Sequence, residues 1–228
     1  PSRRMESWRF GTPGNESLEN FEAAPPVAPE ALASIIREHA SMPDAIRIVY
    51  ANGLPVSIPE ELPEGLAVMD LEDFVLQYPD AARKHLETAP ETLGSEKLAA
   101  LNTALQHNGL VIMADREISR PLEIFHFISG DNVAVFPATL VIAETGSRLH
   151  ILERHVSADH GSQFCGALQQ HHLSSASSVK YVLVQELNSR SRAVELCHIM
   201  ADDSAEMEHL VSHPGCLLYT SPSPRDST

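Results

Sequence analysis

A short pattern recurs at nearly equal intervals in the second half of the chain. Each copy begins with an apolar residue and continues with small and polar residues, and the copies start at Ile142, Leu173 and Met200. These starts lie 31 and 27 residues apart, and each copy precedes a segment of alternating apolar and polar residues, at 149–153, 179–184 and 207–211. Recurrence near this period is typical of a solenoid, in which each coil buries one face against its neighbours.

The segments between the copies favour β-strands over helices. Apolar and polar residues alternate with a period near two from Leu122 onward, and 121–213 has almost no helical pattern and no hairpin turn signal. We therefore predict a mostly β fold, with a partial right-handed parallel β-helix that starts between residues 110 and 125. Each strand should pair with the equivalent strand of the next coil, and 121–213 should contain no helix longer than about two turns.

Residues 1–120 are predicted to form a small mixed α/β region that precedes the core at 121–215. After a loop at 11–29, Pro29 suits the start of a helix at 30–39, with an apolar face. A strand at 46–50 runs into Asn52-Gly53, a strong hairpin signal. Further helices are predicted at 71–77, at 80–87 and after an N-cap at Ser95, followed by a strand at 110–114. The predicted apolar faces consist of Leu32, Ile35 and Ile36 in the first helix and of Leu98, Leu101 and Leu105 in the last.

The last residues, 216–228, differ from the rest of the chain. The run CLLYTSPSPRD, from Cys216 to Asp226, matches one reading-frame translation of a common transposase sequencing adapter. The alternative interpretation is a natural Ser/Pro-rich tail. We interpret 216–228 as translated adapter and expect it to lack regular structure and packed contacts. The chain begins with Pro1 and not with Met, so we expect its N-terminus to be cut or processed as well.

Five segments together resemble one known family. They read LVIAETGSRLHILERHVS, QFCGALQQHHLSSASSVKYVLVQE and CHIMADDSAEMEHLVSHPG in the repeat region, preceded by RRMESWRF at 3–10 and by the segment 101–130. This order of segments resembles the SufB/SufD family of iron–sulfur cluster assembly proteins, and SufD more than SufB. The resemblance spans residues 3–215 and implies a protein truncated at its C-terminus.

The resemblance implies a non-catalytic, SufD-like scaffold subunit of the SUF iron–sulfur cluster assembly complex. Its implied partners are a SufB-like subunit, through the β-helix, and a SufC-type ATPase, through a C-terminal region beyond this chain. The complex would assemble the cluster, and this fragment would bind no cofactor itself. The location expected from the low cysteine content is the cytoplasm, or the plastid stroma if the source is photosynthetic. The family's interface Cys and His lie beyond residue 215 and correspond to no residue here.

Histidines and cysteines in the repeat region are the candidates for chemistry. A metal site needs three or four converging ligands, and an all-cysteine cluster needs about four thiolates. We expect these side chains to be stacked or surface polar groups, with a transient metal or sulfur contact as the alternative, so no catalytic, cofactor-binding or metal residue is assigned. His172 and His198 are expected to be neighbours on adjacent coils. The other candidates are His171, Cys197, His209 and His213.

The two cysteines outside the tail, Cys165 and Cys197, lie in apolar runs. A free cysteine in such a run is most often a small buried hydrophobe, and the alternative is a thiol on a sulfur-transfer route. Two lone thiols form no disulfide framework, which favours a reducing compartment. Trp8 and Arg9 are interpreted as anchors of the N-terminal region.

Charge and missing motifs exclude several functions. A net charge of −15 disfavours nucleic acid and anionic membranes, and no apolar run approaches the ~18 residues that span a bilayer. The chain has no Gly-x-Ser-x-Gly elbow and no phosphate-binding P-loop, so we predict that it is not an enzyme. Two acidic pairs, Glu60-Glu61 and Asp202-Asp203, are interpreted as solvated corners. The alternative functions are a carbohydrate-active β-helix protein, such as a polysaccharide lyase, and a structural solenoid.

Overall fold

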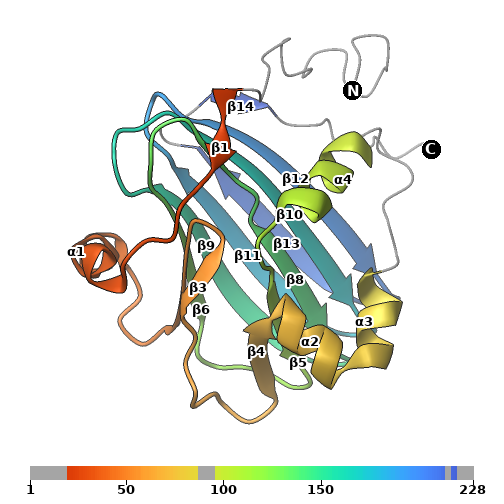
Figure 1. Ribbon diagram of the computed structural model, residues 1–228. Helices are drawn as coiled ribbons and strands as arrows, with labels where there is room; N and C mark the ends of the chain where they lie inside the picture. Colours follow the sequence, from red (N-terminus) through yellow and green to blue (C-terminus); the bar gives the residue numbers. More distant parts are fainter. Residues whose placement is uncertain (1–19, 87–95, 214–216, 220–228) are drawn as a thin grey trace.

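Two β-sheets form a solenoid of about 4 turns in the computed structural model, which describes residues 20–86, 96–213 and 217–219 (Figure 1). The first sheet contains β1 (Glu22–Ala23), β4 (Leu66–Asp70), β5 (Leu110–Ala114), β7 (Val133–Val135), β8 (Ala138–Ala143), β10 (Gln163–Leu173), β12 (Arg192–Ala201) and β14 (Leu217–Tyr219). The second sheet contains β2 (Ile46–Ala51), β3 (Leu54–Ser57), β6 (Leu122–Ile128), β9 (Arg148–Ser157), β11 (Ser178–Glu186) and β13 (Glu206–Ser212). The fold is mostly β, as predicted.

Strands of successive coils pair in parallel, which confirms the predicted β-helix. In the second sheet Leu149 of β9 faces Val179 of β11, which in turn faces Met207 of β13. Strands β8, β10 and β12 stack in the same way in the first sheet. No helix lies between residues 121 and 213.

Parallel stacking begins earlier in the chain than predicted. Strand β2 pairs in parallel with β6, so that Ile46 and Ile48 extend the rows of Leu122 and Ile124. The alternating apolar side chains of β2 can therefore join the same buried interior as the later coils. Strands from both sides of residue 120 share both sheets, and the proposed domain division there stays a prediction.

The repeated corners are tight turns, at 144–147, 174–177 and 202–205. In each turn the backbone N–H of the fourth residue donates to the carbonyl of the first, over 3.0–3.1 Å. The third residue has a positive φ in every turn, 73° at Gly146, 59° at Ala176 and 62° at Ser204. This is the position at which type II turns require a left-handed backbone, which explains the small residues found there.

The main core lies between the two sheets. Its fully buried members come from every coil, and they include Ile124, Val141, Leu149 and Val179. Inward and outward residues alternate along each strand because successive side chains point to opposite faces of a sheet. This alternation also directs several polar side chains into the interior.

The described residues form four helices around the sheets: α1 (Pro29–His39), α2 (Leu71–Gln77), α3 (Pro79–Leu86) and α4 (Glu96–Leu105). Helix α1 packs Leu32 on Phe125 and Phe127 of β6, while α2, α3 and α4 lie along the outer face of the first sheet (Figure 1). Asp70 caps α2 by accepting a hydrogen bond from the backbone N–H of Asp73 at 2.8 Å. These helices and the Asn52-Gly53 hairpin confirm the predicted elements.

Two details of the prediction are wrong. Leu105 does not complete an apolar stripe, since it is 47% exposed, and α4 instead buries Asn102, whose side chain donates to the carbonyl of Gly166 at 2.6 Å. The tail is not free of regular structure, because β14 pairs in parallel with β12. Backbone pairing needs only an extended segment beside an open edge strand, so it does not depend on the tail's origin.

The side chain of Leu98 and the whole of Trp8, Arg9, Ser95 and Cys216 lie outside the described residues, as does 220–228.

Candidate functional site

A row of polar side chains crosses the interior of the coil stack. In the second sheet, Glu153 of β9 pairs with Ile124 of β6 and with Leu183 of β11. His155 pairs with His126 and Gln185 on the same two neighbouring strands. Glu153 and His155 are both 0% exposed. A buried charge is costly unless it is paired and hydrogen-bonded, so the contacts of Glu153 decide whether it can stay ionised.

The carboxylate of Glu153 is fully supplied with donors. It accepts hydrogen bonds from His155 Nε2 at 2.7 Å, from Thr139 Oγ1 at 2.9 Å and from the hydroxyl of Tyr181. Burial acts to raise the pKa of Glu153, but the hydrogen bonds from His155 and Tyr181 and the nearby His126 outweigh it and lower the pKa to about 2. Glu153 is therefore an anion at neutral pH.

His155 joins this carboxylate to a thiol. Its Nδ1 lies 3.6 Å from Cys165 Sγ and 2.9 Å from Gln185 Nε2. Burial acts to lower the pKa of His155, but Cys165 and Glu153 outweigh it and raise the pKa well above its usual value. The order Cys165–His155–Glu153 has the chemistry of a nucleophile, a base and an orienting acid.

Burial limits what this Cys–His–Glu group can do. Cys165 is also 0% exposed and packs in an apolar cluster, which agrees with its interpretation as a buried hydrophobe. A catalytic nucleophile needs a path to its substrate, and none of the three side chains reaches solvent in the described structure. The sequence contained a signal for part of this group. Side chains two positions apart on a strand share a face, so Glu153 is expected on the same inward face as Leu149 and Ile151. Its meeting with Cys165 depends on how the two sheets face each other.

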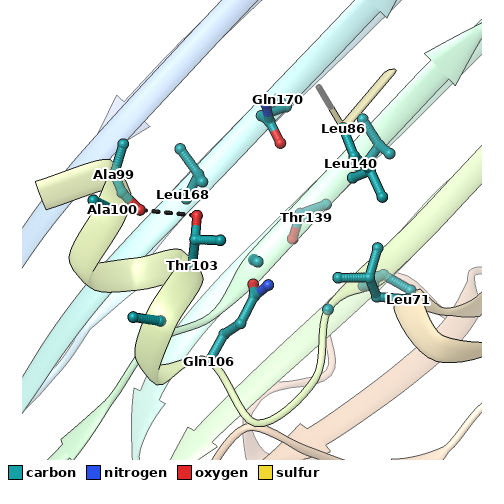
Figure 2. A pocket seen from close by; sticks show the side chains of 14 residues that line it. Leu71, Leu86, Ala99, Ala100, Thr103, Gln106, Thr139, Leu140, Leu168 and Gln170 are labelled. Atoms are coloured by element: carbon teal, nitrogen blue, oxygen red, sulfur yellow. Dashed lines mark hydrogen bonds between the residues drawn. The ribbon is translucent and has the colours of Figure 1, made fainter. Parts of the chain in front are cut away.

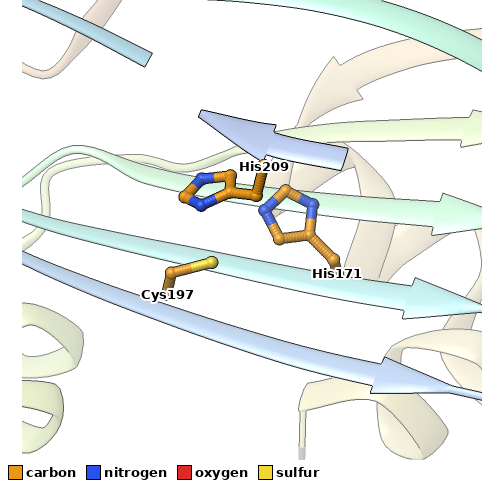
Figure 3. Close-up of side chains that lie close together, drawn as sticks. All are labelled: His171, Cys197 and His209. Carbon is orange, nitrogen blue, oxygen red and sulfur yellow. The ribbon is translucent and has the colours of Figure 1, made fainter. Parts of the chain in front are cut away.

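A second group of donors spans two adjacent coils, formed by β10–β11 and by β12–β13 (Figure 3). His171 on β10, Cys197 on β12 and His209 on β13 each offer a ligand atom, and these atoms all lie within 4.8 Å of one another. Burial, Glu153 and Glu195 raise the pKa of Cys197 to about 12, so this thiol is not activated as sulfur transfer would need.

The remaining histidine candidates are separated from this group. His172 pairs in register with Met200, and His198 pairs with Gln170, so the two histidines do not stack at equivalent positions. They are nevertheless neighbours on adjacent strands, and His198 contributes to lowering the pKa of His172. The two side chains share the outer face but sit two positions apart along it. His172 instead contacts His85 of α3, with 2.9 Å between their Nδ1 atoms. His213 lies 3.8 Å from Glu195.

A pocket of about 540 Å³ opens between the helices and the outer face of the first sheet (Figure 2). Its lining is mostly apolar, and the hydroxyl of Thr103 donates a hydrogen bond to the carbonyl of Ala99 at 3.0 Å. None of the described lining residues is titratable, so the pocket offers volume without acid–base groups. The lining consists of Leu71, Leu86, Ala99, Ala100, Thr103, Ala104, Gln106, Gly109, Leu110, Ala138, Thr139, Leu140, Leu168 and Gln170.

Two further findings concern the surface. The acidic pairs Glu60-Glu61 and Asp202-Asp203 are exposed, as predicted for solvated corners. None of the helices in the described residues has the length and apolar character needed to cross a membrane.

Comparison with known proteins identifies the coil stack. Residues 126–219 match the family model for SUF system FeS cluster assembly, SufBD core domain. The coil stack at 126–219 is a SufBD core domain. The match covers the coils that carry Glu153, His155, Cys165 and the His171–Cys197–His209 group, and it confirms the family that the sequence segments resemble.

Curated members of the SufBD family are similar over part of the chain. An iron–sulfur cluster assembly SufBD family protein of Pyrococcus horikoshii is 28% identical over 160 residues, which are 60% of this chain and 36% of that protein. Relatives with the same description are 29% identical over 108 residues in Staphylococcus aureus and over 92 residues in Mycobacterium tuberculosis. These matches cover 46% and 40% of this chain, and 22% and 11% of the relatives. The chain thus spans about a third or less of the length of these SufBD proteins.

Proposed function

We propose that this chain is a SufD-like, non-catalytic scaffold subunit of the SUF complex. The observation that carries the proposal is the match of the SufBD core domain to the parallel coil stack. Stacked coils make a rigid body, and β13 has one edge that pairs with no further strand among the described residues, which suits a SufB-like partner. The family match gives no support to the polysaccharide lyase or structural solenoid alternatives.

In this proposal the SUF complex assembles the cluster, and this chain holds none of its own. The described residues contain two thiols, Cys165 and Cys197, against the roughly four that an all-cysteine cluster needs. ATP hydrolysis belongs to a SufC-type partner, bound through a region outside this sequence. The free thiols suit a reducing compartment, the cytoplasm or the plastid stroma.

The test is co-expression with the SufB-like and SufC-type proteins of the same source, followed by affinity purification and anaerobic cluster reconstitution. We expect co-purification of all three chains and a cluster yield that depends on this subunit. The isolated chain should neither hydrolyse ATP nor keep an iron–sulfur spectrum after desalting. A stable cluster of about one per chain, held by the isolated protein and lost in Cys165→Ser or Cys197→Ser, would refute the scaffold role.

A second candidate role, sulfur transfer through Cys165, is favoured by its contact with His155. Protonated His155 would stabilise a Cys165 thiolate, which could attack the terminal sulfur of a persulfide donor and release the donor's thiolate. Burial of Cys165 means that the coil would have to open. Cys165→Ser should then abolish cluster yield while complex formation persists, whereas a pure scaffold would keep both.

A further inference from the structure

The His171–Cys197–His209 group brings three metal-binding side chains together from two sheets. His171 and Cys197 come from neighbouring strands of the first sheet, and His209 approaches from the second (Figure 3). The rings of His171 and His209 are tilted against each other, with centroids 5.9 Å apart. The group lies at β13, whose only described neighbour is β11. An ion could therefore enter from the end of the stack.

The imidazoles of this group carry unused nitrogen atoms. Both ring nitrogens of His171 are buried without a hydrogen-bond partner, and Nε2 of His209 is in the same state. His171 is 0% exposed. Leaving buried polar atoms unpaired destabilises a fold, and a bound cation would satisfy these lone pairs.

The electrostatic surroundings favour a cation. Two carboxylates, Glu153 and Glu195, act on Cys197 in addition to its burial. Burial, reinforced by His209, lowers the pKa of His171 to about 3. Burial likewise lowers the pKa of His209. The unpartnered imidazole nitrogens can donate lone pairs to a metal, in a site where the carboxylate of Glu153 attracts positive charge.

We propose that His171, Cys197 and His209 bind a single divalent cation of the zinc class. Two imidazoles and one thiolate suit zinc and cobalt, whereas magnesium and calcium prefer oxygen ligands. Tetrahedral zinc would place the ligand atoms about 3.3–3.7 Å apart, so no pair of ligand atoms needs to approach by more than about 1.5 Å. Cys197 and His209 are half-buried, which gives them room to do so. The fourth position would hold water or a further ligand.

The experiment uses the full chain with Cys216→Ser, so that Cys165 and Cys197 are its only thiols. Chelator-treated protein is titrated with cobalt(II) under anaerobic conditions. We expect a thiolate-to-cobalt charge-transfer band and strong visible bands of tetrahedral cobalt, saturating at about one cobalt per chain and displaced by zinc. Affinity should weaken by about tenfold per unit of falling pH, because binding releases the Cys197 proton.

Variants separate this site from adventitious binding. Cys197→Ser should abolish the charge-transfer band, and His171→Gln or His209→Gln should weaken binding by more than the roughly 100-fold that loss of an outer-shell partner can cost. Cys165→Ser and His198→Gln are matched controls that should bind normally. If a ligand variant fails to fold, thermal unfolding of the parent protein with and without zinc serves as the test, because bound zinc should raise its Tm. Absence of the band or of the Tm rise, persistence of the band in Cys197→Ser, or its equal loss in Cys165→Ser would overturn the proposal. None of these readouts depends on the scaffold role.

Discussion

His155 Nε2 lies 2.7 Å from Oε1 of Glu153, two residues away on the same strand, and both side chains are completely buried. The alternation of a strand points both side chains to the same face, so an ion pair forms within a single coil. Thr139, on β8 of the same coil, and Tyr181 and Cys165, from the next coil, complete the contacts. The interior of this solenoid is therefore organised around a charge as well as around apolar rows.

Removing the charge of Glu153 should destabilise the protein strongly. Glu153→Gln leaves His155 without its anionic partner, and loss of one member of a buried ion pair costs about 3–5 kcal/mol. Urea unfolding at pH 7 measures this change. Glu208→Gln is the matched control, because its ion pair with Lys180 is exposed and should contribute less than about 1 kcal/mol. Equal losses in the two variants would contradict a special role for Glu153.

Acid should destabilise the fold through its buried neutral histidines. Burial lowers the pKa of His126 to about 4, despite Glu153 nearby and with His155 adding to the shift. A folded-state pKa below the unfolded value of about 6.5 gives stability that is present above pH 6.5 and lost as pH falls toward 4. His155 has a raised pKa, so its contribution is lost as pH rises above 6.5 and is constant in this acid window.

His126→Phe isolates this effect, since neither ring nitrogen of His126 has a hydrogen-bond partner. Compared with the parent, the variant should lose about 2 kcal/mol less stability between pH 7.5 and pH 5. Chemical denaturation at the two pH values gives the difference, in which the contributions of Glu195 and other groups cancel. Parallel losses in parent and variant would show that His126 does not titrate as inferred.

The corner turns allow a paired test of backbone strain. Gly146 and Ala176 occupy equivalent positions with positive φ, and a Cβ on Gly146 would meet nothing within 4 Å. Gly146→Ala should therefore destabilise by about 1 kcal/mol through φ alone, and Ala176→Gly should stabilise by up to about 1 kcal/mol. Thermal unfolding measures both. Changes of the same sign in the two variants would rule out a shared turn conformation.

How much of this structure can be predicted from the sequence depends on how far apart along the chain the interacting residues lie. Strand alternation and small corner residues are local, so the coils and the positions of Gly146 and Ala176 could be found from the pattern. The inward direction of Glu153 follows from parity. The grouping of His171, Cys197 and His209 could not be found, because it depends on the register between coils and on how two sheets face each other. His172 and His198 do not stack at equivalent positions for the same reason, since a shift of two positions separates them.

The outer edge of β13, which pairs with no strand in the described part of the chain, should make the isolated chain self-associate. Leu210 on this strand is 61% exposed, and edge strands offer unpaired backbone groups to other copies. We expect the chain, expressed without partners, to form concentration-dependent oligomers or aggregates and to be sensitive to proteases.

Leu210→Lys should reduce this association, because charged residues protect sheet edges. Leu105→Lys is the matched control, since Leu105 is 47% exposed but lies on the helix α4 and not on a strand. Sedimentation velocity over a range of concentrations compares the three proteins. A monomeric parent with a sharp cooperative melt, or equal improvement by both lysines, would show that the β13 edge does not drive association.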